Sequence, residues 1–425
     1  MSDTFEPNAT RVVDRFLRYV RIDTTSAEDS PHFPSTAVQL DLARLLAEEL
    51  RELGLTDAVL DQYGYVFATL PSNLPPQTAQ QIPVIAFIAH VDTYFGVSGK
   101  DVQPVVHRAY GGGDIALPGD PAQVIRVDEN PELADFVGDD IITSDGTTLL
   151  GADDKAGVAE IMAAVEYLVQ HPEIPRGTVK IAFTPDEEVG NGTKYFDVAK
   201  FGAAFAYTID GGYPGEVENE TFCADTAIVQ FAGRDVHPGY AKGKMVNAVR
   251  AAAYFAGLYS EESLPETTSD RQGYLHPYQL EGNVSAAKLT TLIRDFTVEG
   301  LGQFHDILNS YAAITQERFP GVDVDVQIKE SYRNMIYKLQ EEPRVMDYAV
   351  EAVQRAGVEP ILKAIRGGTD GARLSYMGLL TPNLFAGGMN FHSKQEWVAV
   401  GAMVKAVETI LHLVQVWRER SLDER

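Results

Sequence analysis

Short apolar runs alternate along the chain with segments of helical periodicity. Four runs have the composition of strands buried on both faces, at residues 84–89, 179–183, 204–209 and, more loosely, 384–386. Apolar residues recur at helical spacing over residues 39–53, 157–169 and 345–356. This alternation predicts an α/β domain with a mainly parallel sheet.

The middle of the chain has a different texture. Residues 229–239, 283–296 and 324–332 are typical of strands and turns, whereas residues 245–258 and a long segment from Glu299 are typical of helices. Two successive strand, helix, strand passages predict an α+β open sandwich of the ferredoxin-like type. We therefore expect residues 221–333 to form a domain inserted into a first domain made of residues 1–220 and 334–425.

Charge and composition exclude several kinds of partner. The 425 residues include 35 Lys and Arg against 61 Asp and Glu, a formal net charge of −26, which argues against nucleic acid or an anionic membrane as partner. No apolar run approaches the roughly 18 residues of a membrane span, and residues 11–20 are amphipathic rather than a signal peptide. Cys223 is the single cysteine, so a reducing compartment, the cytoplasm, is expected.

Acidic and histidine side chains follow the apolar runs directly. Because the carboxyl ends of parallel strands form a ligand crevice, these side chains are predicted to converge. They are His90, Asp92, Asp153, Asp154, Asp186, Glu187, Glu188, Asp210 and His392.

Several unpaired carboxylates in one crevice would repel one another, and a polyvalent cation removes that repulsion. Two histidines with three or more carboxylates suit zinc, manganese or cobalt, and more than one ion could be held. His90 and Asp92 point to the same side of an extended segment, which suits a ligand and the residue that orients it. Of Glu187 and Glu188, one is expected to bind metal and the other to accept a proton, and their spacing leaves the choice open.

Eight motifs, spread in order from His90 to Trp397, resemble those of the peptidase T family of tripeptide aminopeptidases, which are co-catalytic zinc metallopeptidases. The resemblance implies an enzyme with two Zn²⁺ per subunit that releases the N-terminal residue of short peptides, preferentially tripeptides, and forms a homodimer. The motifs are IAHVDT, LGADDKAGVAEI, TPDEEVGNG, TIDGG, VHPGYAKGKMVNA, LIRDF, IRGGTDGARLSYMGL and PNLFAGGMNFHSKQEW.

The same resemblance implies a role for each matching residue. His90 and Asp210 would bind one zinc ion, Glu188 and His392 would bind the other, and Asp153 would bridge the two. Glu187 would be the general base, and Asp92 would orient His90. His237 and Arg294, in the inserted domain, would bind the substrate when that domain closes as a lid, and the same domain would serve dimerisation.

Two alternatives stay open at this point. A related dizinc dipeptidase or N-acyl amino acid amidohydrolase would share the metal core and differ in whether a free amino terminus is required. A metal-binding protein without turnover is the other alternative, and the presence of Glu187 argues against it.

Overall fold

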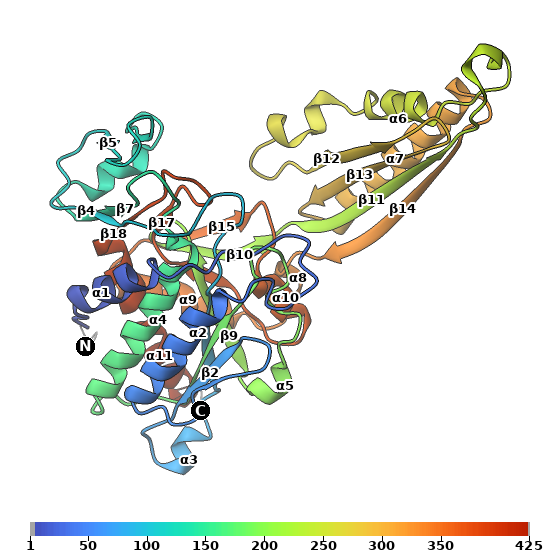
Figure 1. Cartoon of the computed structure of the whole chain (residues 1–425). Coiled ribbons are helices and arrows are strands. Elements are labelled where there is room, and N and C mark those ends of the chain that lie inside the picture. Colours follow the sequence, from blue (N-terminus) through green and yellow to red (C-terminus); the bar gives the residue numbers. More distant parts are fainter. Residues whose placement is uncertain (1–4, 424–425) are drawn as a thin grey trace. The chain divides into compact units, whose positions relative to one another are not determined.

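The structure is a computed structural model that describes residues 5–423, and the chain divides into two compact units (Figure 1). Unit 1 comprises Met1–Asn219, Tyr337–Lys363 and Thr369–Arg425, and unit 2 comprises Glu220–Ile336 and Ala364–Gly368. Each unit has its own sheet and its own buried core.

Unit 1 is built on an eight-stranded sheet in the order β1-β2-β8-β3-β9-β16-β10-β15. Its four neighbouring strands β8, β3, β9 and β16 run parallel, whereas β2 and β10 are antiparallel to their partners β8 and β16. The predicted α/β class with a mainly parallel sheet is confirmed. The strands are β1 Val59–Leu60, β2 Val66–Leu70, β3 Ile85–His90, β8 Val179–Thr184, β9 Phe205–Gly211, β10 Glu216–Thr221, β15 Ile361–Ile365 and β16 Asn383–Phe385.

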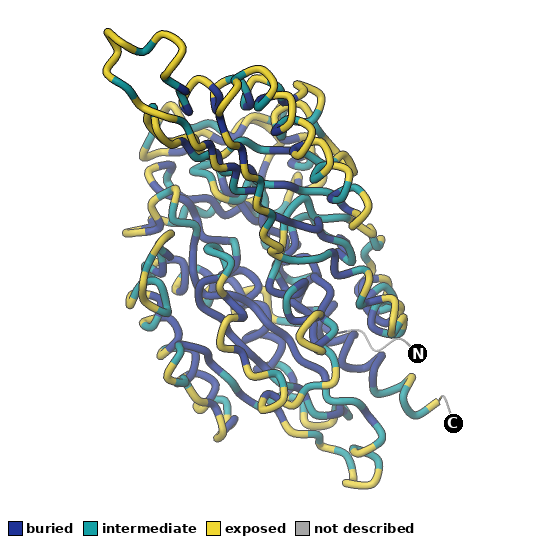
Figure 2. Tube along the Cα trace, turned by 90° about the vertical axis from the view of Figure 1, so that its right-hand side faces the viewer, coloured by how far each residue is buried: buried dark blue, intermediate teal, exposed yellow. Residues whose placement is uncertain are grey.

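Helices cover this sheet, so its central strands are apolar on both faces. Every residue of β3 is buried, and Ala86 and Ile88 contact a cluster that includes Phe201 of α5 and Leu374 of α10. Burial runs through the middle of unit 1, and exposed residues are concentrated in its loops (Figure 2). The helices are α1 Ala9–Tyr19, α2 Gln39–Glu52, α3 Pro76–Ala79, α4 Ala152–Gln170, α5 Val198–Phe201, α8 Ile336–Leu339, α9 Arg344–Arg355, α10 Asp370–Tyr376 and α11 Val400–Asp423.

A small second sheet in unit 1 was not predicted. It has four short strands in the order β17-β18-β7-β4, joined by antiparallel pairing. A separate two-stranded sheet, β5 with β6, is formed by the segment of sequence between β4 and β7. Trp397 and Ile141 are buried in its core. The strands are β4 Val105–His107, β5 Ile115–Ala116, β6 Val124–Ile125, β7 Ile141–Thr143, β17 Gly388–Met389 and β18 Trp397–Ala399.

Unit 2 has the chain order β11, α6, β12, β13, α7, β14 and an antiparallel sheet in the order β12-β13-β11-β14. This is the predicted ferredoxin-like open sandwich. Alternate residues of β11, such as Val229 and Phe231, pack against Phe255 of α6 and Leu308 of α7. The elements are β11 Cys223–Ala232, α6 Ala248–Ala256, β12 Tyr274–Gly282, β13 Ala286–Asp295, α7 Val298–Arg318 and β14 Asp323–Tyr332.

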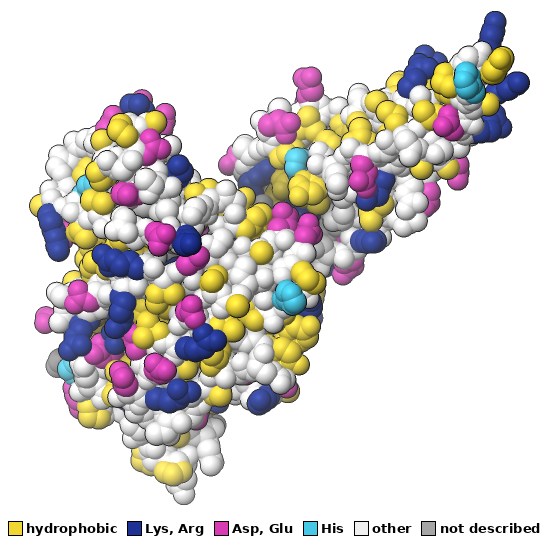
Figure 3. Space-filling view, in the orientation of Figure 1, with side chains coloured by type: hydrophobic (Ala, Val, Ile, Leu, Met, Phe, Trp, Pro, Cys, Tyr) yellow, Lys and Arg dark blue, Asp and Glu magenta, His cyan; other side chains and the backbone are white. Residues whose placement is uncertain are grey.

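Charged side chains are unevenly spread over unit 2. Lys and Arg gather at one end of it, where the connection between β11 and α6 exposes Arg234, Lys242 and Lys244 (Figure 3).

Among the described residues, one helix, α11, is long and apolar enough to span a membrane by length and composition alone, although it contains no continuous apolar run of about 18 residues. Of its most apolar window, 72% is buried inside the protein, which is the burial of a core helix.

Candidate metal centre

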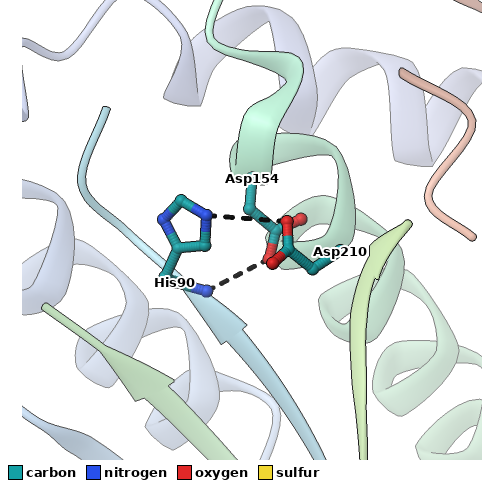
Figure 4. Close-up of side chains that lie close together, drawn as sticks. All are labelled: His90, Asp154 and Asp210. Atoms are coloured by element: carbon teal, nitrogen blue, oxygen red, sulfur yellow. Dashed lines mark hydrogen bonds and ion pairs between the residues drawn. The ribbon is translucent and has the colours of Figure 1, made fainter. Parts of the chain in front are cut away.

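The predicted ligands of unit 1 meet at the carboxyl ends of the parallel strands. His90 is the last residue of β3 and Asp210 lies near the end of β9, while Asp153 belongs to the first turn of α4. Glu188 follows β8, and His392 lies in the loop between β17 and β18. Figure 4 shows the His90 ring facing Asp210, with Asp154 beside them at the start of α4.

Asp153 lies between the two histidines. The Nε2 atom of His90 is 2.8 Å from Oδ1 of Asp153 and 3.6 Å from Oδ1 of Asp210. On the other side, Nε2 of His392 is 3.1 Å from Oδ2 of Asp153 and 2.8 Å from Oε2 of Glu188. Five side chains from five separate chain segments therefore present imidazole nitrogens and carboxylate oxygens to one another.

Asp92 holds two parts of the site in place. Its backbone oxygen lies 3.0 Å from Nδ1 of His90, and its Oδ1 lies 3.4 Å from the same nitrogen. Its carboxylate also accepts hydrogen bonds from the amides of Glu187 and Glu188, at 3.0 and 3.2 Å. Asp92 is fully buried. Through these contacts it fixes both the His90 ring and the turn that carries the two glutamates.

Burial and mutual charge shift the pKa values of these groups. Burial disfavours the protonated form of His90, but the carboxylates of Asp210 and Asp153 outweigh it and raise the pKa of His90 well above its ordinary value. Asp153 and Glu188 likewise outweigh burial and raise the pKa of His392 to about 11. Burial raises the pKa of Glu188 to about 8 and that of Asp210 to about 6. A cation among these carboxylates would relieve the cost of charging them.

The residues present fit metal ions. Atoms of His90, Asp153 and Glu188 lie within 4.8 Å of one another, as do atoms of His90, Asp154 and Asp210. Oε1 of Glu188 and Oδ1 of Asp154 are buried and have no hydrogen-bond partner among residues 5–423. The other oxygen of Asp154 accepts a hydrogen bond from the backbone amide of His90 at 3.1 Å. The peptide bond between Asp153 and Asp154 is cis.

Glu396 is a supporting residue that the sequence motifs did not identify. Its two carboxylate oxygens accept hydrogen bonds from the backbone amides of Leu150, Gly151 and Asp153, at 2.9, 2.8 and 2.9 Å. It is fully buried. Glu396 thus ties the loop of His392 to the segment that carries Asp153, through contacts between residues about 245 positions apart.

Replacing Glu396 with glutamine is expected to lower the free energy of unfolding by about 1–3 kcal/mol, because the new amide group would face a buried N–H and leave it without an acceptor. Chemical denaturation measured by circular dichroism checks this. Glu129→Gln makes the same chemical change at an exposed side chain and should leave the unfolding midpoint where it is. An equal midpoint for Glu396→Gln would contradict the assigned role.

The two predicted substrate residues belong to unit 2. His237 is exposed, and its Nδ1 accepts a hydrogen bond from the amide of Gly239 at 3.2 Å. Arg294 is half-buried on β13, and its Nη1 donates to the backbone oxygens of Asp225 and Ile293. Their roles therefore stay predictions.

Comparison with known proteins gives consistent matches over nearly the whole chain. Residues 144–416 match the model of peptidase family M20/M25/M40. The chain is 45% identical over 410 residues to a peptidase T of Geobacillus thermodenitrificans, covering 96% of this chain and 99% of the relative. It is 46% identical over 409 residues to a peptidase T of Listeria monocytogenes, with the same coverage. A crystal structure of aminopeptidase PepT from Bacillus cereus shares the fold, with a TM-score of 0.74, 23% identity and coverage of 97% of this chain and 99% of that one.

Proposed function

This chain belongs to peptidase family M20/M25/M40, and from that premise we propose that it is a metal-dependent aminopeptidase that releases the N-terminal residue of tripeptides. The observation that carries the proposal is the cluster of imidazoles and carboxylates around Asp153, with a half-buried glutamate, Glu187, near it. The 45% identity to a peptidase T over 96% of the chain supports the tripeptide preference.

The ligand set suits two divalent ions, and zinc is the proposed metal because it takes histidine nitrogen and carboxylate oxygen at four-coordinate sites. His90 and Asp210 would hold one ion, Glu188 and His392 the other, and Asp153 would lie between them. When bound, the ions would polarise the scissile carbonyl and lower the pKa of the attacking water.

Glu187 is the proposed general base. Burial raises its pKa well above the ordinary value, with the nearby carboxylates of Asp370 and Asp210 adding to that effect. A carboxylate with a raised pKa accepts a proton from water more readily and can return it to the departing amine. The backbone amide of Glu187 is fixed by Asp92, so the side chain starts from a defined position.

The roles proposed for unit 2 rest on the family resemblance. His237 would donate to the carbonyl oxygen as negative charge develops on it, and Arg294 would pair with the peptide's terminal carboxylate. Residues 221–333 as lid and dimerisation domain, the homodimer and the cytoplasmic location also stay predictions.

A comparison of three substrates tests the proposed function. Purified, zinc-loaded protein would be incubated with an unblocked tripeptide, its N-acetylated twin and a dipeptide, and the products identified by mass spectrometry. We expect release of the first residue from the unblocked tripeptide alone. Cleavage mainly of the dipeptide or the acetylated peptide would instead indicate a related dipeptidase or N-acyl amino acid amidohydrolase, and no cleavage of any of them would contradict an exopeptidase.

A further inference from the structure

The two histidines of the candidate metal centre are held in different ways. His90 is buried, and its Nδ1 faces the backbone oxygen of Asp92 at 3.0 Å, so a hydrogen bond fixes the plane of the ring. Metal-binding histidines ordinarily have such a partner on the second ring nitrogen, which sets both the tautomer and the orientation of the ring.

His392 has no such partner. Its Nε2 faces Glu188 and Asp153, but Nδ1 makes no hydrogen bond to any residue in the described range 5–423. The side chain is 44% exposed, and its backbone lies in the left-handed region at φ 60°. A half-exposed ring on a loop, held through one nitrogen, could rotate about its side-chain bonds unless another contact restrained it.

Tyr94 supplies that contact. Its ring lies parallel to the His392 ring, with the centroids 4.2 Å apart and the planes 6° from parallel. Tyr94 follows His90 by four residues in the segment HVDTYFGVSG, so one loop carries a ligand of one proposed ion and restrains a ligand of the other. A flat stack of this kind fixes the plane of the imidazole without using either nitrogen.

Gly96 makes room for this stack. A Cβ atom at position 96 would lie 2.4 Å from Cε1, 2.6 Å from Cζ and 2.7 Å from the hydroxyl oxygen of the Tyr94 ring. Gly96 has no unusual backbone angle, so the constraint at this position is the space that the tyrosine ring occupies.

We propose that Tyr94 is a positioning residue for His392, and that its ring, seated over Gly96, takes the place of the hydrogen-bonded orienter that His90 has. The inference rests on the proposed function, since it requires that His392 bind a metal ion. Tyr94 has no proposed contact with the substrate and no proposed part in proton transfer.

The experiment is a zinc titration of the full-length apoprotein, with a chromophoric chelator as competitor, comparing the wild type with Tyr94→Ala and Tyr94→Phe. In Tyr94→Ala, one of the two ions is expected to bind about 2- to 10-fold more weakly, the loss that corresponds to one aromatic stack. The other ion should bind as in the wild type. Tyr94→Phe keeps the ring and should restore wild-type binding, because no hydrogen bond of the Tyr94 hydroxyl occurs among the described residues.

Gly96→Ala provides a second, independent variant. Its added methyl group should push the Tyr94 ring aside and weaken the same ion, whereas in a Tyr94→Ala background it should have no further effect. Two controls match these changes. Gly111→Ala adds a methyl group where nothing lies within 4 Å, and Tyr195→Ala removes a tyrosine stacked at 4.4 Å and 7° on Tyr63 rather than on a histidine.

The outcomes separate this inference from the proposed function. A wild-type protein that binds no zinc would overturn the proposed function itself. A wild type that binds two ions, together with Tyr94→Ala that binds both equally well, would overturn the role of Tyr94 alone. Equal losses from Gly96→Ala with and without the Tyr94 ring would also overturn it, and circular dichroism would establish that each variant is folded.

Discussion

Replacing Glu187 with glutamine should reduce kcat for an unblocked tripeptide by about 10²- to 10⁴-fold, the usual contribution of a general acid–base group. Glutamine has nearly the same shape but cannot accept the proton of the attacking water. The backbone amide of Glu187 would still donate to Asp92, so the turn should keep its conformation. Steady-state kinetics on the zinc-loaded variant measures the effect.

The neighbouring glutamate provides the matched control. Glu187→Gln is expected to retain both zinc ions, whereas Glu188→Gln should lose affinity for one of them, because Glu188 is 2.8 Å from Nε2 of His392 in the proposed second site. Metal content measured after dialysis distinguishes the two variants. Unchanged turnover in Glu187→Gln would show that another group accepts the proton.

Asp153→Asn is expected to have the largest effect on metal binding. The carboxylate lies within 3.1 Å of both His90 and His392. Although burial opposes its charge, these two imidazoles hold its pKa below the ordinary value. Loss of that charge removes the one ligand shared by both proposed ions, so the affinity for each should fall by more than about 100-fold, the upper range for loss of an outer-shell partner. Zinc titration of the apoprotein and tripeptide turnover should fall together.

Asp154→Asn is the adjacent control. The side-chain oxygen of asparagine can still accept the hydrogen bond that the His90 amide gives to Asp154 at 3.1 Å. The proposed ligand set does not include Asp154, so this variant should bind two ions nearly as the wild type does. A loss of metal in Asp154→Asn as large as that in Asp153→Asn would show that both carboxylates coordinate.

The parts of the fold that the sequence predicted are those with strong periodicity. The buried run at residues 84–89 became β3, and the helical pattern at 157–169 became the middle of α4. The strand β12 was missed because it lies at the edge of the unit 2 sheet, is largely exposed and contains Pro277, all of which weaken a strand pattern. The strands β17 and β18 have only two and three residues, too few to show any period.

The sequence also predicted which ligand residues of the candidate site converge, but not the residues that support them. The residue types after the buried strands indicated which side chains would converge, and the structure brings His90, Asp153, Glu188, Asp210 and His392 together. Their individual roles stay predictions. Glu396 and Tyr94 could not be found from spacing, because their contacts depend on loop conformations that bring distant segments together.

The order in which the ligands occur along the chain has a consequence for biosynthesis. Between Asp210 and His392, 181 residues intervene, and they include all of unit 2. At about 5–20 residues per second, a ribosome needs roughly 10–35 s to add them. During that interval the nascent chain has four of the five proposed ligands but lacks His392 and the strand β16 that pairs with β9. A newly made chain should therefore become competent to cleave peptides only when nearly all of it has been translated.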